Sequence, residues 1–340
     1  YDRENSKDAI RCLSLDTGEE IWRYTYSVEI KRNHGMSRTV PAVANGYVVS
    51  FGPKCHIKCL DAETGELNWE RQLVMDNNAR VPLWYAGQCP LIDGKNVILA
   101  PGADPLMMAI DIETGEIVWE AVDDVITGQT HSSIIPMEIE GVRQYVYEAE
   151  TGVVGVEAET GRVLWTYPGW KIKIANVASP VYVGGGRIFC SGGYGAGSAM
   201  LQIEKDESGQ FTTQELFRLP PSVFGSEQHT PIFYDGYLYG VEPRPKAEMV
   251  CLNVDGEREW ASGGEHRFEI GPYMIVDGRM LALHGQTGEL SLAEVSPAGF
   301  TPLAKAKVLD GHDVWAPMAY AEGRLIVRDL TQMICLDIGD

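Results

Sequence analysis

The sequence predicts an all-β protein, a β-propeller built from four-stranded antiparallel blades. Two recurring markers predict this fold. The first is a turn of the form Asp/Glu-Thr-Gly with a tryptophan four residues after the glycine. The second is a proline that opens a short apolar run ending in a turn glycine. The markers recur at a pitch of about 40–50 residues, and a period of that length is typical of propellers and solenoids.

The first marker reads as a β-hairpin. Its best copy runs from Cys59 to Trp69, and glycine supplies the positive φ that the tight turn between the two strands needs. Further copies run from Cys12 to Trp22, from Ala109 to Trp119, from Gly155 to Trp165 and, with a shorter turn, from Cys251 to Trp260. One aromatic side chain per hairpin, fixed relative to a glycine, predicts that these tryptophans pack between neighbouring blades.

The second marker supplies the other two strands of each repeat. Proline is tolerated as the first residue of a strand, because no ladder N–H is lost there. The prolines in question are Pro41, Pro90, Pro136, Pro180, Pro231, Pro272 and Pro317. One unit therefore reads as proline strand, turn, strand, loop, strand, Thr-Gly turn and tryptophan strand, which is one propeller blade.

The two ends of the chain carry incomplete units. Residues 1–26 contain only the third and fourth strands of a blade, and residues 317–338 contain the first three strands of another. The sequence contains eight segments that read as the third strand of a blade, but only seven strands that open with a proline. This count predicts eight blades, with the N-terminal blade incomplete and a preceding segment missing. The alternative is seven blades closed by residues 20–26. Because no linker interrupts the repeat, we expect a single propeller domain over residues 1–340.

Composition excludes several classes of function. The net charge of −20 argues against nucleic-acid binding, which normally requires a basic stripe. No apolar run approaches the ~18 residues that a membrane-spanning helix needs. Cys12, Cys59, Cys251 and Cys335 fall on one repeat position that other copies fill with alanine or glycine, which predicts small, inert core residues. No pair of Cys-x-x-Cys motifs indicates zinc or haem.

The candidate ligand-binding residues lie in the connections that lead from each blade to the next. These connections emerge on one face, at the mouth of the expected central channel, and they gather basic, aromatic and imidazole side chains. The predicted site comprises Arg80, Trp84, His131, Lys173, His229, His312 and Trp315. Such a set would suit a polar small molecule or a partner peptide. The alternative is that these side chains cap loop backbone around a water-filled funnel. No catalytic or metal-binding residue is predicted.

The repeated (Ala/Cys)-x-Asp-x-x-Thr-Gly-Glu-x-x-Trp pattern resembles the tryptophan-docking repeat of PQQ-like, quinoprotein-dehydrogenase-like propellers. The resemblance covers essentially the whole chain, although the copies near Gly209 and Gly299 lack the tryptophan. That family includes PQQ-dependent alcohol dehydrogenases and non-enzymatic, BamB-type lipoproteins of outer-membrane protein assembly. The resemblance implies export to the periplasm or cell surface. It also implies a non-enzymatic binding or scaffolding role that uses the channel mouth or a flank to bind a protein partner or small polar ligand.

The alternative implied by the same resemblance is a PQQ-dependent alcohol dehydrogenase. The enzymes of the family hold the quinone between a tryptophan floor and a ring of adjacent, disulfide-bonded cysteines, beside a calcium ion. This sequence has no Cys-Cys dipeptide and no recognisable cluster of calcium ligands. No cofactor is therefore expected, and PQQ with calcium is kept as the alternative.

Overall fold

The computed structural model describes residues 1–2, 4–31, 34, 37–311 and 313–339. In this part of the chain there are 29 β-strands and one short helix, α1 (Leu73–Asp76). The predicted all-β class is therefore confirmed. Successive strands form antiparallel sheets, and the strands that pair within a sheet are consecutive in sequence.

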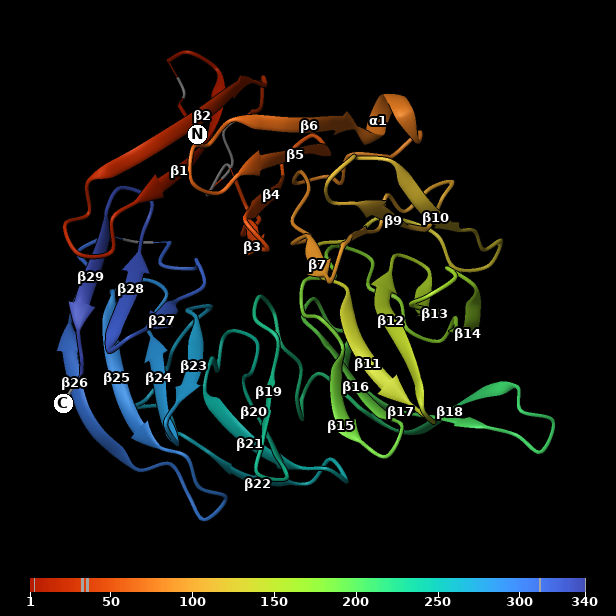
Figure 1. The fold of residues 1–340 in the computed structure, drawn as a ribbon. Helices are drawn as coiled ribbons and strands as arrows, with labels where there is room; N and C mark the ends of the chain where they lie inside the picture. The colour runs from red at the N-terminus through yellow and green to blue at the C-terminus, as the bar shows by residue number, and fades with distance from the viewer. Residues whose placement is uncertain (3, 32–33, 35–36, 312, 340) are drawn as a thin grey trace. The chain divides into compact units, whose positions relative to one another are not determined.

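Six sheets have four strands each, in the order in which the strands occur in the chain (Figure 1). The first two are β3 (Ala42–Ala44), β4 (Tyr47–Phe51), β5 (His56–Asp61), β6 (Leu67–Gln72), and β7 (Leu91–Asp93), β8 (Asn96–Leu99), β9 (Met107–Asp111), β10 (Ile117–Ala121). The next two are β11 (Ile135–Ile139), β12 (Val142–Ala149), β13 (Gly152–Glu157), β14 (Val163–Tyr167), and β15 (Val181–Gly184), β16 (Arg187–Gly192), β17 (Gly197–Lys205), β18 (Phe211–Leu219). The last two are β19 (Ile232–Tyr234), β20 (Tyr237–Val241), β21 (Met249–Asn253), β22 (Arg258–Ala261), and β23 (Tyr273–Val276), β24 (Arg279–Leu283), β25 (Glu289–Glu294), β26 (Pro302–Lys307).

The expectation of eight four-stranded blades is wrong, and the alternative of seven blades agrees with the structure. Besides the six complete blades there is one three-stranded sheet, formed by β27 (Ala319–Ala321), β28 (Arg324–Arg328) and β29 (Met333–Asp337). Strands β1 (Lys7–Leu13) and β2 (Glu20–Ser27) pair with each other in a two-stranded sheet. They carry the Thr-Gly turn and the tryptophan of a blade without its first two strands, so counting that motif in the sequence overcounts the blades.

The chain divides into two compact units. The first consists of residues 1–180 together with residues 202–214, and the second of residues 181–201 together with residues 215–340. The sheet β15–β18 contributes its hairpin segment 202–214 to the first unit and its other residues to the second. The expected single domain over residues 1–340 stays a prediction.

The Thr-Gly turns are held by the side chain of their acidic residue. Asp61 Oδ1 accepts hydrogen bonds from the backbone N–H groups of Glu63 (3.0 Å) and Thr64 (2.8 Å) and from Thr64 Oγ1 (3.0 Å). Asp111 repeats the arrangement in the next blade. These hydrogen bonds lower the pKa of both carboxyl groups, with those from Thr64 and Thr114 the largest causes, because they stabilise the ionised form. The acidic residues are thus explained by the turn itself.

Trp22, Trp69 and Trp119 connect neighbouring blades, as the sequence predicts, whereas Trp165 donates its Nε1 hydrogen bond to Gln144 of its own blade. Trp22 Nε1 donates a hydrogen bond to the Ala62 carbonyl (3.0 Å), and its ring covers Gly65, where an added Cβ would come within 2.6 Å of the ring. The same two contacts join Trp69 to Ile112 and Gly115, and Trp119 to Ala158 and Gly161. In these three cases the tryptophan of one blade docks on the Thr-Gly turn of the following blade.

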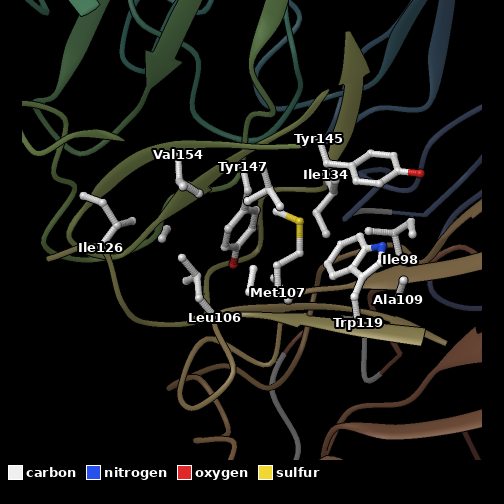
Figure 2. Packing of buried hydrophobic residues seen from close by; sticks show 14 residues of the cluster. Ile98, Leu106, Met107, Ala109, Trp119, Ile126, Ile134, Tyr145, Tyr147 and Val154 are labelled. Atoms are coloured by element: carbon white, nitrogen blue, oxygen red, sulfur yellow. The ribbon is translucent and has the colours of Figure 1, made fainter. Parts of the chain in front are cut away.

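The core of the first unit lies between consecutive sheets. Figure 2 shows one such cluster, in which side chains of β8, β9 and β10 meet those of β12 and β13. Trp119 and Tyr145 stack with their ring centroids 6.1 Å apart, and Met107, Leu106 and Tyr147 fill the space beside them. Burial of large aromatic side chains at each contact between blades is the main source of stability in such a repeat.

The second unit is built on the same plan. Clusters around Phe224 and Leu238, around Tyr239 and Phe268, and around Leu283 and Val327 join its successive sheets. Trp260 docks on a degenerate turn, because its Nε1 donates to the Ser296 carbonyl at 2.8 Å and its ring lies against Phe300. The docking contact therefore persists although the repeat copy that receives Trp260, near Gly299, has no tryptophan of its own.

Candidate functional site

The connections between blades form the predicted site. In a blade of four antiparallel strands, the connection after the fourth strand and the connection after the second lie at the same end of the sheet. In the first unit the connections after β6, β10 and β14 span residues 73–90, 122–134 and 168–180. All three enter the first strand of the next sheet through a proline or a residue close to one.

Direct hydrogen bonds fasten these three connections to one another. The N–H of Cys89 donates to Ser133 Oγ (3.0 Å), and the N–H of Ser133 donates to Ser179 Oγ (2.9 Å). The N–H of His131 donates to the Asn176 carbonyl at 2.9 Å. Because backbone groups take part in each bond, the three connections hold one arrangement and present a preorganised surface.

The predicted residues of the first unit have two kinds of environment. Arg80 and Lys173 are exposed, whereas Trp84 and His131 are half-buried. The four residues come from all three connections, so the sequence places them on the same end of adjacent blades. Of these four side chains, only Arg80 and Lys173 are exposed to a ligand that approaches from solvent.

The imidazole of His131 is held by packing. An added Cβ on Gly87 would come within 2.6 Å of the His131 ring, which shows how closely the backbone approaches it. Burial, together with the nearby charge of Arg38, lowers the pKa of His131 to about 4, against a smaller opposite effect of the Tyr85 backbone. His131 is therefore neutral at pH 7 and does not supply a positive charge to a ligand.

The second unit contains the remaining predicted residues. Burial lowers the pKa of His229 to about 4, and its Nε2 lies 3.2 Å from the Ile270 carbonyl of the next connection. Its ring also packs against Tyr273, whose hydroxyl donates to the Thr230 carbonyl. Trp315 is half-buried in the connection that leads to β27, and His312 lies outside the described residues.

Sequence reasoning missed the apolar side chains that these connections expose. The Met75 and Leu83 side chains are 78% and 80% exposed, the largest values among the exposed hydrophobic residues. We use the name loop surface for the exposed apolar and predicted cationic residues of the three connections, namely Val74, Met75, Arg80, Leu83, Val122, Val125, Lys173 and Ile174. The signal in the sequence was the presence of large apolar residues outside the alternating strands.

The residues of the described chain do not fit a quinone site of the dehydrogenase type. All seven cysteines are free thiols, and none is adjacent to another in sequence. Burial raises the pKa of Cys55 and Cys59 to about 12, so these thiols are unreactive near neutral pH. No group of three or more His, Cys, Asp or Glu side chains suited to a metal ion occurs in the ranges that the structure describes. We therefore assign no step to PQQ or calcium.

The repeated sheets and the docked tryptophans together define a β-propeller of the PQQ-like repeat class. A family model described as outer membrane protein assembly factor BamB matches residues 6–262, which is more than half of the chain. The chain belongs to this family. It is 26% identical to outer membrane protein assembly factor BamB of Alteromonas naphthalenivorans, over 75% of this chain and 64% of that protein. With BamB of Escherichia coli K12 it shares 26% identity over 34% of this chain and 27% of that protein.

Solved structures show the same fold. BamB from Moraxella catarrhalis superposes with a TM-score of 0.64 at 13% identity and covers 96% of this chain and 95% of its own. Quinohemoprotein alcohol dehydrogenase from Comamonas testosteroni gives a TM-score of 0.60 at 14% identity, over 94% of this chain and 67% of that chain. A europium-containing methanol dehydrogenase gives 0.62 at 14% identity, over 94% and 78%. Enzymes and an assembly factor thus share this fold, so the fold alone does not decide the activity.

No helix in the described ranges is both long enough and apolar enough to cross a membrane.

Proposed function

We propose that this chain is a non-enzymatic, exported scaffold that binds a protein partner during outer-membrane protein assembly, and that the loop surface is its docking face. Family membership supports the assembly role and the location in the periplasm. The chain spans 64% of the length of the Alteromonas relative, so the partner is part of the proposal. The observation that carries the proposal is the exposure of Met75 and Leu83 on connections fixed by backbone hydrogen bonds.

The energetic argument concerns exposed apolar area. Complete burial of one leucine or methionine side chain stabilises by about 1.5–3 kcal/mol, so a partner that covers both residues would gain several kcal/mol. Methionine and arginine are enriched at protein interfaces, and Arg80 lies between Met75 and Leu83 in sequence. Because the connections are already ordered, docking would cost little conformational entropy.

The test is site-specific photocrosslinking in the bacterium that expresses the chain. A photoreactive amino acid placed at position 83 should yield a crosslink to a protein of the outer-membrane assembly machinery. The Met75→Glu, Leu83→Glu double substitution should weaken partner binding at least about tenfold, because two charged carboxylates would have to lose their water at an interface that buries apolar side chains. Lower levels of assembled outer-membrane proteins should accompany the loss of binding.

The matched control is Leu303→Glu with a photoreactive residue at position 303. Leu303 is 45% exposed on strand β26, which belongs to the second unit and to none of the three connections. This control should leave partner binding unchanged. Crosslinks at position 303 without any at position 83, or normal partner binding by the double variant, would contradict the proposed docking face.

A further inference from the structure

A separate cavity lies within the second unit. Its volume is about 640 Å³, which is within the range of small-molecule sites. It is lined by Tyr194, Gly195, Pro221, Ser222, Glu227, Glu242, Pro243, Arg244, Pro245 and Lys246. None of these residues belongs to the predicted site or to the loop surface. Three connections contribute, namely those between β16 and β17, between β18 and β19, and between β20 and β21.

Glycines allow two of these connections to approach closely. The Gly-rich connection between β16 and β17 closes as a tight turn, in which the N–H of Ala196 donates to the Gly193 carbonyl at 3.0 Å. An added Cβ on Gly193 would come within 2.8 Å of Glu227 Cα, and one on Gly197 within 2.1 Å of the Leu219 carbonyl oxygen. The Gly-rich connection therefore builds one wall of the cavity.

Charged side chains are arranged in two layers. The Glu227 and Glu242 side chains are only 11% and 2% exposed, whereas Arg244 and Lys246 are 48% and 51% exposed. Arg244 Nη2 donates to Glu227 Oε1 at 2.6 Å and Arg244 Nε to Glu227 Oε2 at 3.4 Å. This forked contact fixes the plane of the guanidinium. The buried carboxylates thus orient two cations whose charges face solvent.

The two cations that contact Glu242 bind the same oxygen of its carboxylate. Glu242 Oε2 accepts from Lys246 Nζ (3.3 Å) and from Arg258 Nη2 (3.1 Å). Glu242 Oε1 is buried and accepts no hydrogen bond from the residues that the structure describes. Glu269 also acts electrostatically on Arg244, so three carboxylates balance the charges of Arg244, Lys246 and Arg258. The groups open to a ligand are hydrogen-bond donors of Arg244 and Lys246, so the ligand must bring acceptors.

An apolar rim adjoins these donors. Tyr194 is partly exposed, and the rings of Pro221, Pro243 and Pro245 line the cavity beside it. Rigid rings of this kind lose little conformational entropy when they bury apolar surface. A ligand that combines an acidic group with a flat apolar group would satisfy both halves of the cavity.

We propose that this cavity binds a carboxylate carried next to an aromatic or similar apolar group, with Arg244 and Lys246 holding the carboxylate and Tyr194 and the prolines holding the apolar part. The terminus of a peptide and a free aromatic acid share this chemistry. The site lies in the second unit, whereas the proposed docking face belongs to the first, so the two proposals stand independently.

The test compares acids with their neutral amides by calorimetric titration of the purified chain. The probes are 3-phenylpropionate and N-acetylglycylphenylalanine, each paired with its primary amide. We expect the acids to bind saturably and the amides at least about tenfold more weakly. Binding of both acids would indicate that the terminal carboxylate suffices, and binding of the dipeptide acid alone would indicate a peptide terminus. Equal binding of acids and amides, or no binding of either acid, would overturn the proposal.

Variants locate the site. Arg244→Gln and Lys246→Gln should each weaken acid binding at least about fivefold, and Tyr194→Ala should weaken it as well. Lys307→Gln, on the exposed strand β26, removes the same charge away from the cavity and should have no effect. Glu242→Gln separates the proposal from a cationic ligand, because it removes a buried negative charge but keeps a side-chain oxygen that can accept from Lys246 and Arg258, so acid binding should be preserved or strengthened. Unfolding temperatures identify any variant that fails to fold, and unchanged binding in folded Arg244→Gln and Lys246→Gln would refute the assignment.

Discussion

At the residue scale, some of the predicted ligand-binding residues pack inside the fold, whereas others face solvent. His131 and His229 were predicted as ligand donors, but burial lowers the pKa of both, and His229 also contacts the Ile270 carbonyl. The sequence placed both in the correct connections. It did not reveal their burial, because burial depends on the neighbouring connection, which is remote in sequence. Their role in binding stays a prediction.

The two histidines should make stability depend on pH. Each has a pKa of about 4 in the fold and an ordinary value near 6.5 when unfolded. The unfolded chain therefore binds more protons between pH 6.5 and 4, and stability falls as the pH is lowered through this window. The slope should be at most about 1.4 kcal/mol per pH unit for each histidine. Urea unfolding at pH 7, 6 and 5 measures it.

The control for this prediction is the His131→Gln, His229→Gln double variant. Glutamine cannot titrate but keeps a hydrogen-bond donor that can reach a carbonyl. The difference in unfolding free energy between pH 7 and pH 5 should become smaller in the variant than in the original chain. An identical pH dependence in both proteins would show that other groups cause the loss of stability.

At the scale of elements, the repeat made most of the fold predictable. Strand order within a blade, the proline at the start of the first strand and the docking of Trp22, Trp69 and Trp119 all follow from local patterns. The blade count did not follow, because a motif that occupies two strands was taken as a mark of a whole blade. The cavity beside Tyr194 and Arg244 also escaped prediction, since it needs three connections that only the fold brings together.

The docking of a tryptophan on a glycine can be tested with two matched glycines. Gly161 and Gly141 both have positive φ, at 77° and 71°, but only Gly161 lies under a ring, with its Cβ position 2.6 Å from Trp119. Gly141→Ala should cost about 1–2 kcal/mol from backbone strain alone. Gly161→Ala should cost about 2 kcal/mol more, because the ring must leave its site. Guanidinium unfolding compares the two variants, and equal costs would disprove the importance of the contact.

At the scale of the whole molecule, cysteines at equivalent positions of the repeat differ in how deeply they are buried. Cys59 and Cys251 are buried as expected, whereas Cys335, at the equivalent position, is exposed. Its strand β29 is the last of a three-stranded sheet, while β5 and β21 each have a fourth strand beside them. Sequence equivalence therefore did not carry over to environment, because the environment depends on the strand next to the residue.

Thiol labelling of the native chain should report this difference. Cys335 should react first, followed by Cys12 and Cys89, which are half-buried. The four buried thiols, Cys55, Cys59, Cys190 and Cys251, should react only on unfolding. Mass spectrometry after a timed reaction with a maleimide gives the order. Cys335→Ser should remove the fastest phase, and early labelling of Cys251 would contradict the assigned burial.

The docking of Trp22, Trp69 and Trp119 on the following blade has a consequence for how the chain is made. Trp119 finds its glycine only after residue 161 has been synthesised, so the blade that carries Trp119 leaves the ribosome with its indole ring still uncovered. This part of the growing chain would thus be completed blade by blade, each new blade covering the tryptophan of the one before it. A translation product that stops between Trp119 and Gly161 would carry an exposed aromatic ring, a feature by which quality-control factors could distinguish it from the finished protein.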